Sequence, residues 1–181
     1  LLAWFFFIAC LIMCRIYYSG SLLFVFLVWN IFLAWILFFI SSYLQPLSAV
    51  RWKHYLLLFA WVLFFPNSLY IITDLIHLDI ETGIPKWFDA ILLFSASAAG
   101  LMMAFISLYR VEQFLHKMAG PKTVTGLMLL ILFLGSFGVY LGRFLRWNSW
   151  DIITNPVQLF VSIGGRIIFP LDHLYTWGVT V

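Results

Sequence analysis

The sequence predicts an all-α fold, a polytopic bundle of transmembrane helices. The chain of 181 residues is 65% apolar and 20% aromatic, and only 9% of its residues are charged. Soluble domains are about a quarter charged and under half apolar. Apolar runs recur along the chain, and about twenty such residues cross the roughly 30 Å of hydrocarbon in a bilayer. Because no linker or internal repeat divides the chain, we expect a single integral membrane domain over residues 1–181.

The apolar runs predict about six spans, the last of them truncated by the end of the chain. In order they cover residues 1–14, 21–44, 53–73, 87–109, 124–145, and the chain from 172 onward. The segment 156–170 is too short to cross, and Pro156 after Asn155 is typical of a helix start. We therefore expect a short interfacial or re-entrant helix there. The first run lacks the basic start and small cleavage residues of a signal peptide, and we expect the natural protein to extend beyond both ends.

Two of the spans carry small residues at helical spacing. Ala96 and Gly100 lie four apart in one span, and Gly138 and Gly142 form a GxxxG pattern in the next. In lipid, such residues let helix backbones approach closely. GxxxG is common in apolar segments, so packing within the chain is favoured over dimerisation.

The charges predict an orientation and exclude some functions. Two loops are basic and nearly free of acids, and they hold Arg51, Lys53, His54, Arg110, Lys117 and Lys122. Such loops tend to stay cytoplasmic, which predicts a cytoplasmic N-terminus. A net charge of +3 is too small to indicate nucleic acid. Cys10 and Cys14 have no further ligands nearby and are interpreted as packing residues, and we expect no cofactor.

Polar residues interrupt the apolar pattern in three places on the predicted outer face. The first is Pro66-Asn67, because proline removes a backbone donor inside a span. It is either a simple kink or a break that protein or a water-filled cavity must cover. The second holds Asp74 and His77, which at i, i+3 would share a helical face. Together with Asp79 these are weak metal candidates, but their spacing matches no metal motif, so we expect no metal site.

The third place is the end of the fifth span, where Arg143 follows an unbroken apolar run and Arg146 lies three residues later. A single terminal arginine can snorkel to the headgroups. Two arginines can also form an internal network with carboxylates, or hold an anionic headgroup through paired hydrogen bonds. The candidate headgroup residues are Arg143, Arg146, Trp147, Asn148 and Trp150. The candidate network residues are Asn30, Asn67, Tyr70, Asp74, Asp89 and Asp151, with Asn67 the expected partner of Asn30.

Several of these stretches resemble a set of bacterial multi-spanning proteins catalogued as domain of unknown function thirteen sixty-one. The matching stretches are Trp29 to Trp35, Phe65-Pro66-Asn67 with Tyr70, Thr73 and Asp74, Trp87-Phe88-Asp89, and Tyr140 to Asp151. The resemblance covers nearly the whole chain, although Leu37 stands where the family often has proline. It implies a multi-pass protein of the bacterial cytoplasmic membrane with its signature residues near one face, and it implies no established activity.

Three kinds of function remain open from the sequence. The first is an accessory or binding protein, which could be a subunit of a larger membrane complex. Its partners would be membrane lipids and protein chains. The second is an enzyme or binding protein for an anionic lipid or lipid-linked substrate, with Arg143 and Arg146 as anion ligands and Asp74 or His77 as acid or base. The third is a small transporter with Asn30 and Asn67 along its path. Accessory binding is favoured, since no nucleophile–base pair and no repeat is evident.

Overall fold

The computed structural model describes residues 1–44, 51–79, 83–147 and 151–180, and this part of the chain forms helices without strands. The long helices are α1 (Leu2–Ser19), α2 (Phe26–Tyr43), α3 (Trp52–Tyr70), α4 (Lys86–Leu115) and α5 (Pro121–Phe144). A 3-10 helix, η1 (Ile71–Asp79), continues α3. The short elements near the C-terminus are α6 (Asp151–Thr154), α7 (Pro156–Ile168), η2 (Pro170–His173) and α8 (Leu174–Thr180). Five described helices are long and apolar enough to cross a membrane, the third of them running from Trp52 to Leu78, which confirms the predicted fold class.

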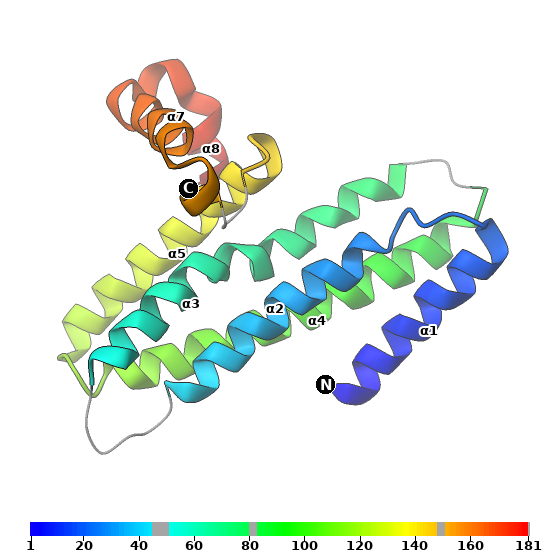
Figure 1. Cartoon of the computed structure of the whole chain (residues 1–181), viewed down its shortest axis with the longest axis horizontal. Helices are drawn as coiled ribbons and strands as arrows, with labels where there is room; N and C mark the ends of the chain where they lie inside the picture. Colours follow the sequence, from blue (N-terminus) through cyan, green and yellow to red (C-terminus); the bar gives the residue numbers. More distant parts are fainter. Residues whose placement is uncertain (45–50, 80–82, 148–150, 181) are drawn as a thin grey trace.

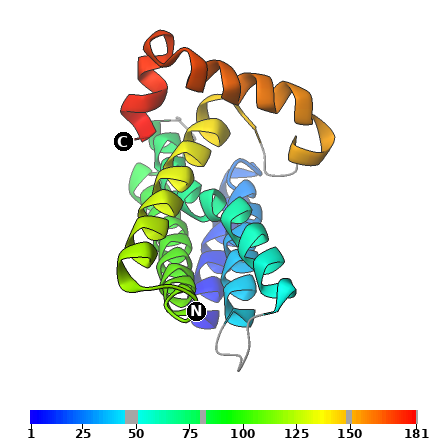
Figure 2. The same ribbon diagram turned by 90° about the vertical axis from the view of Figure 1, so that its left-hand side faces the viewer.

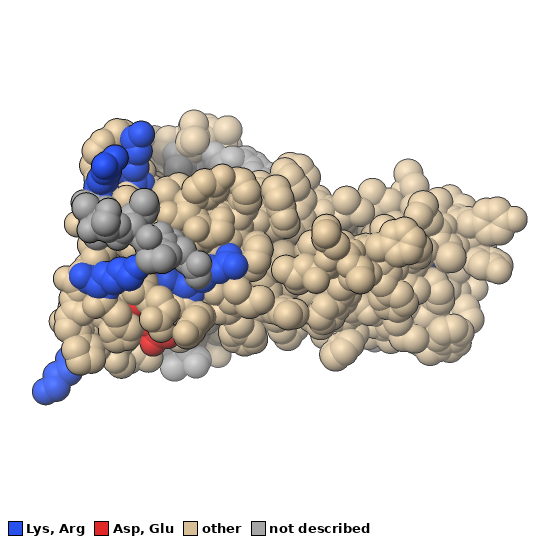
Figure 3. Space-filling view, turned by 90° about the horizontal axis from the view of Figure 1, so that it is seen from below, with Lys and Arg blue, Asp and Glu red and all other residues tan. Residues whose placement is uncertain are grey.

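The five long helices run side by side and alternate in direction (Figure 1). Helix α2 packs between α3 and α4, while α5 lies against α3 and α1 lies against α4. The ends of α1, η1 and α5 and the starts of α2 and α4 therefore share one end of the bundle, here called the polar end. The opposite end is the basic end, and Figure 3 shows lysine and arginine side chains gathered over one end of the face in view.

Two helices extend further than the sequence predicted. We expected the first span to end at residue 14, but α1 continues to Ser19 and stops at Gly20, whose left-handed φ of 63° closes the helix. Arg15 therefore lies inside a helix and not in a loop. At the basic end, α4 continues to Leu115, so Arg110 is helical as well and donates to the carbonyl of Phe38 at 3.3 Å.

Close contacts between helices form at the predicted small residues. A Cβ on Gly138 would lie 2.4 Å from Cγ of Pro66, and one on Gly100 would lie 2.4 Å from Cγ2 of Ile71. These glycines let α5 approach α3 and let α4 approach the start of η1, as expected for packing within the chain. The proline of α3 does not break the helix at once, because α-helical geometry persists to Tyr70 before the change to η1.

The C-terminal helices gather at the polar end, beyond the end of α5 (Figures 1 and 2). The 13-residue α7 buries only Leu159 among its described side chains, which suits the expected interfacial segment. Helix α8 then turns back along α5. Tyr175 contacts Phe144 near the end of α5, while Trp177 stacks on Phe137, about two turns earlier in α5. Helix α8 has seven described residues, so the start of a sixth span stays a prediction.

Candidate functional site

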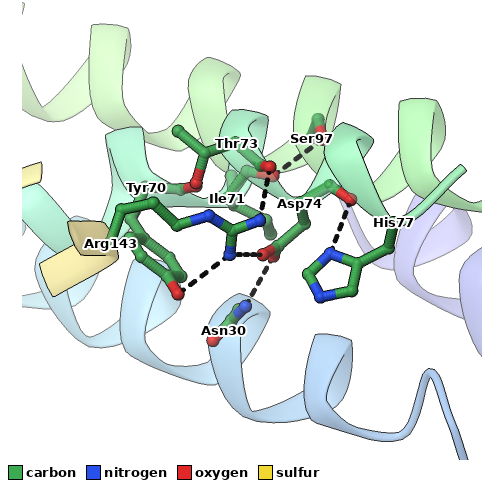
Figure 4. A network of polar contacts seen from close by, with 8 residues as sticks. All are labelled: Asn30, Tyr70, Ile71, Thr73, Asp74, His77, Ser97 and Arg143. Atoms are coloured by element: carbon green, nitrogen blue, oxygen red, sulfur yellow. Dashed lines mark hydrogen bonds and ion pairs between the residues drawn. The ribbon is translucent and has the colours of Figure 1, made fainter. Parts of the chain in front are cut away.

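The geometry of η1 brings its polar residues into one line. A nine-residue 3-10 helix is unusually long, and residues three apart eclipse one another in it. Asp74 and His77 consequently face the same cavity, as their spacing predicted. His77 Nδ1 lies 3.0 Å from the carbonyl oxygen of Asp74, and Ser97 of α4 donates to the carbonyl of Ile71 at 3.0 Å. The second bond fixes the start of η1 against α4 (Figure 4).

Arg143 joins the end of α5 to the end of α3 and to η1. Its Nη1 donates to Oη of Tyr70 at 3.1 Å and to Oδ1 of Asp74 at 3.3 Å, and its Nη2 donates to the carbonyl of Thr73 at 2.8 Å. The Asp74 side chain is 1% exposed and that of Arg143 is 16% exposed. A buried carboxylate needs such a partner, because its charge has lost the hydration of water.

Asn30 of α2 completes this group by donating from Nδ2 to Oδ2 of Asp74 at 2.7 Å. We had expected Asn67 of α3 as the partner of Asn30. The hydrogen bond instead links α2 to η1, the segment that follows α3. Asn67 nevertheless lines a cavity together with Asn30. The Arg143 cluster, as it is called below, comprises Asn30, Tyr70, Thr73, Asp74, His77 and Arg143 (Figure 4).

Three neighbouring cavities extend from this cluster along α3 and α5. The first, of about 280 Å³, is lined by charged and polar side chains of the Arg143 cluster with Phe26. It shares Asn30 and Tyr70 with a second cavity of about 120 Å³. The second shares Asn67, Tyr70, Gly142 and Trp147 with a third, mostly apolar cavity of about 140 Å³. The walls thus change from charged to apolar as they pass from η1 toward α7.

The segment after α5 holds the other headgroup candidates. Arg146 is exposed and has a left-handed φ of 59°, and the N–H of Trp147 donates back to the carbonyl of Leu141 at 3.1 Å. This hydrogen bond closes the end of α5, with arginine at the left-handed position where glycine is usual. Trp147 lines the second and third cavities. Asn148 and Trp150 lie outside the described residues.

Asp89 forms a second arginine–aspartate pair, with a partner that sequence reasoning missed. Arg15 of α1 donates from Nε to Oδ1 of Asp89 at 2.8 Å and from Nη2 to Oδ2 at 3.4 Å. We expected Asp89 to face Arg143 and Arg146, whereas this partner comes from the opposite side of α4. The available signal was Arg15 itself, an arginine that follows directly on an apolar run.

The remaining candidates are Asp151 and the weak metal candidates. Asp151 begins α6 and accepts a hydrogen bond from Thr154 at 3.0 Å. Of the weak metal candidates, Asp74 and His77 share a cavity, and the Asp79 side chain is outside the described part. Among the described residues, no group of three or more His, Cys, Asp or Glu side chains is placed to hold a metal ion.

Comparison with known proteins places the chain in a family. Searches of curated proteins and of solved structures give no match. A family model described as Protein of unknown function (DUF1361) matches residues 29–181, which include most of α2, all later helices and every residue of the Arg143 cluster. The match extends over far more than half of the chain, and the chain therefore belongs to this family of uncharacterised proteins.

Proposed function

We propose that this chain is a binding protein of a bacterial cytoplasmic membrane and that its ligand is an anionic amphiphile, either a lipid or a lipid-linked molecule. The observation that carries the proposal is the run of three cavities with shared walls, charged at one end and apolar at the other. An amphiphile has the same division between a polar head and an apolar chain.

The chemistry of the Arg143 cluster favours a ligand rich in acceptor oxygens. Tyr70 accepts a hydrogen bond from Arg143, so its own hydroxyl hydrogen is left to donate. The amide of Asn30 uses one of its two N–H groups on Asp74 and keeps the other. The charge of Asp74 is balanced by Arg143, and exposed Arg146 follows Arg143 by three residues in the chain. Phosphate and ester oxygens fit this set of donors.

The apolar end of the run suits an acyl or isoprenoid chain. Leu63, Pro66 and Leu141 line the third cavity from α3 and α5, while Leu159 and Ile163 line it from α7. Because α7 is the short helix at the polar end, this cavity lies where headgroups meet hydrocarbon. A lipid could therefore reach the cluster from the side without crossing the bilayer.

The charge distribution supports the proposed orientation. Basic residues lie at the opposite end from the Arg143 cluster, around the starts of α3 and α5 and the end of α4, and include Arg51, Lys53, Lys117 and Lys122. Basic loops tend to remain cytoplasmic. With the N-terminus on the same side, the Arg143 cluster would face outward.

The proposal is tested by filling the apolar cavity without touching the charged residues. Ile163→Trp adds bulk at the cavity wall, and Val161→Trp places the same side chain on an exposed position of the same helix. Native mass spectrometry of protein released from bacterial membranes should show retained phosphatidylglycerol in the wild type and in Val161→Trp, and a loss of about tenfold in Ile163→Trp. Equal retention in all three would rule out the cavity as the lipid site.

A second candidate, the accessory subunit of a membrane complex, is favoured by a row of exposed aromatic side chains on α2. The row consists of Trp29, Phe32, Trp35, Phe39 and Tyr43, and each ring contacts the next. Large rigid aromatic surfaces are enriched where proteins associate. If this face binds another chain, Trp35→Ala should reduce the size of the particle extracted from native membranes. An unchanged size would count against a subunit role.

A further inference from the structure

Arg15 is an almost fully buried cation whose hydrogen-bonding capacity is only partly used. Its residue exposure is 1%, and its Nε and Nη2 atoms face the carboxylate of Asp89. The guanidinium of Arg15 also lies over the ring of Phe24, with Cζ 4.2 Å from the ring centroid. Its third nitrogen, Nη1, is buried and has no hydrogen-bond partner in the described part of the chain. A buried N–H without an acceptor is costly, so this atom points to a missing oxygen.

A large cavity adjoins this arginine at the polar end. Its volume is about 460 Å³, and Arg15, Tyr18, Trp87 and Phe88 line it together with residues 83–85. Tyr18 and Trp87 are exposed on the outer side of α1 and α4. Tyrosine and tryptophan collect at the depth of lipid headgroups, so the cavity opens where phosphate groups would lie.

The local charges favour an anion in spite of Asp89. Asp89 lies in the first turn of α4, where the helix dipole already stabilises a negative charge. The dipole adds to what Arg15 provides for Asp89. The second edge of Arg15, formed by Nη1 and Nη2, has the spacing that a two-oxygen anion matches. The edge formed by Nε and Nη2 is the one that the carboxylate occupies.

We infer that the cavity beside Arg15 is a second anion site, in which Nη1 of Arg15 binds a phosphoryl oxygen of a lipid headgroup or of free phosphate. The site is separate from the Arg143 cluster and does not depend on the function proposed for it. Its aromatic lining at the membrane interface favours the headgroup as the source.

The decisive variant is Arg15→Lys, which keeps a positive charge for Asp89 but removes the second donor edge. Delipidated protein would be titrated in parallel with phosphatidylglycerol and with inorganic phosphate, and the adducts counted by native mass spectrometry. We expect phosphatidylglycerol binding at the Arg15 cavity to weaken by about tenfold or more in Arg15→Lys. Ile163→Trp should leave binding at this cavity unchanged. A loss confined to the phosphate adduct would assign free phosphate as the source, and equal binding of both probes by wild type and Arg15→Lys would overturn the inference.

A second pair of variants keeps the test valid if Arg15→Lys does not fold. Trp87→Ala removes part of the cavity wall without touching the ion pair, and Trp52→Ala removes a similarly exposed tryptophan at the basic end, the two residues being 64% and 67% exposed. We expect Trp87→Ala to weaken phosphatidylglycerol binding severalfold and Trp52→Ala to leave it unchanged. The same effect from both tryptophans would mean non-specific interfacial anchoring and would refute the site.

Discussion

The contact between Gly138 and Pro66 gives a direct test of how α5 approaches α3. A Cβ at Gly138 would lie 2.4 Å from Cγ and 2.7 Å from Cβ of Pro66. Carbon atoms are in favourable contact at about 3.5 Å or more, so Gly138→Ala must move the two helices apart by roughly 1 Å. The proline ring cannot rotate away, because it is closed onto the backbone.

The expected free-energy change follows from two opposing effects. Overpacking a tight contact costs about 1–3 kcal/mol, while replacing a helical glycine by alanine gains about 0.5–1 kcal/mol. Gly126, on the same helix, has no atom within 4 Å of an added Cβ, so Gly126→Ala should show the helical gain alone. The difference between the two variants isolates the overpacking cost.

The assay is reversible unfolding in mixed micelles, with the denaturing detergent titrated against both variants and the wild type. We expect Gly138→Ala to be less stable than Gly126→Ala by about 1–3 kcal/mol. If the two variants have the same stability, α5 does not pack on Pro66 as described. The wall of the third cavity, which Pro66 and Gly138 line, would then be wrong as well.

Four further substitutions test the polar end. Arg143→Ala and Asp74→Ala should each destabilise the protein by about 3–5 kcal/mol, because each leaves a buried charge unpaired. The double variant should lose less than the sum of the two. Additive losses in the same micelle titration would mean that the pair is not coupled. Arg146→Gly should gain about 1 kcal/mol by relieving the left-handed backbone, and a loss in thermal unfolding would show that the arginine itself stabilises this segment. Ser97→Ala should cost about 1 kcal/mol by leaving the carbonyl of Ile71 without its donor, and faster amide hydrogen exchange across η1 should accompany the loss; unchanged exchange would argue against that bond.

The fold was largely predictable because the bilayer imposes a simple rule on apolar segments. The five long runs became five long helices, and the small residues of α4 and α5 marked the close contacts. The helix ends were less predictable. Arg15 looked like the end of a span, yet it is buried because Asp89, 74 residues later, supplies the opposite charge. A local pattern contains no information on such a partner.

The sequence predicted the residues of the candidate site better than it predicted which of them hydrogen-bond to one another. Asn30, Tyr70, Asp74 and Arg143 were all recognised as polar groups in an apolar setting, and the structure brings these four together. The partner of Asn30 was wrong, because the chain changes to a 3-10 helix after Tyr70 and carries Asp74 toward α2. Both helix types bring residues three apart together, so the sequence does not distinguish them.

Mapping the lipid contacts of the protein shows whether an anionic lipid occupies the cavities between the Arg143 cluster and α7. The protein would be reconstituted with phosphatidylglycerol that carries a photoreactive group in its acyl chain, and the labelled residues identified by mass spectrometry. We expect preferential labelling of Leu63, Leu141 and Ile163 at the third cavity, suppressed by unlabelled phosphatidylglycerol but not by phosphatidylcholine. Labelling no stronger there than at exposed side chains of the helix surface such as Phe105 and Leu130 would contradict it.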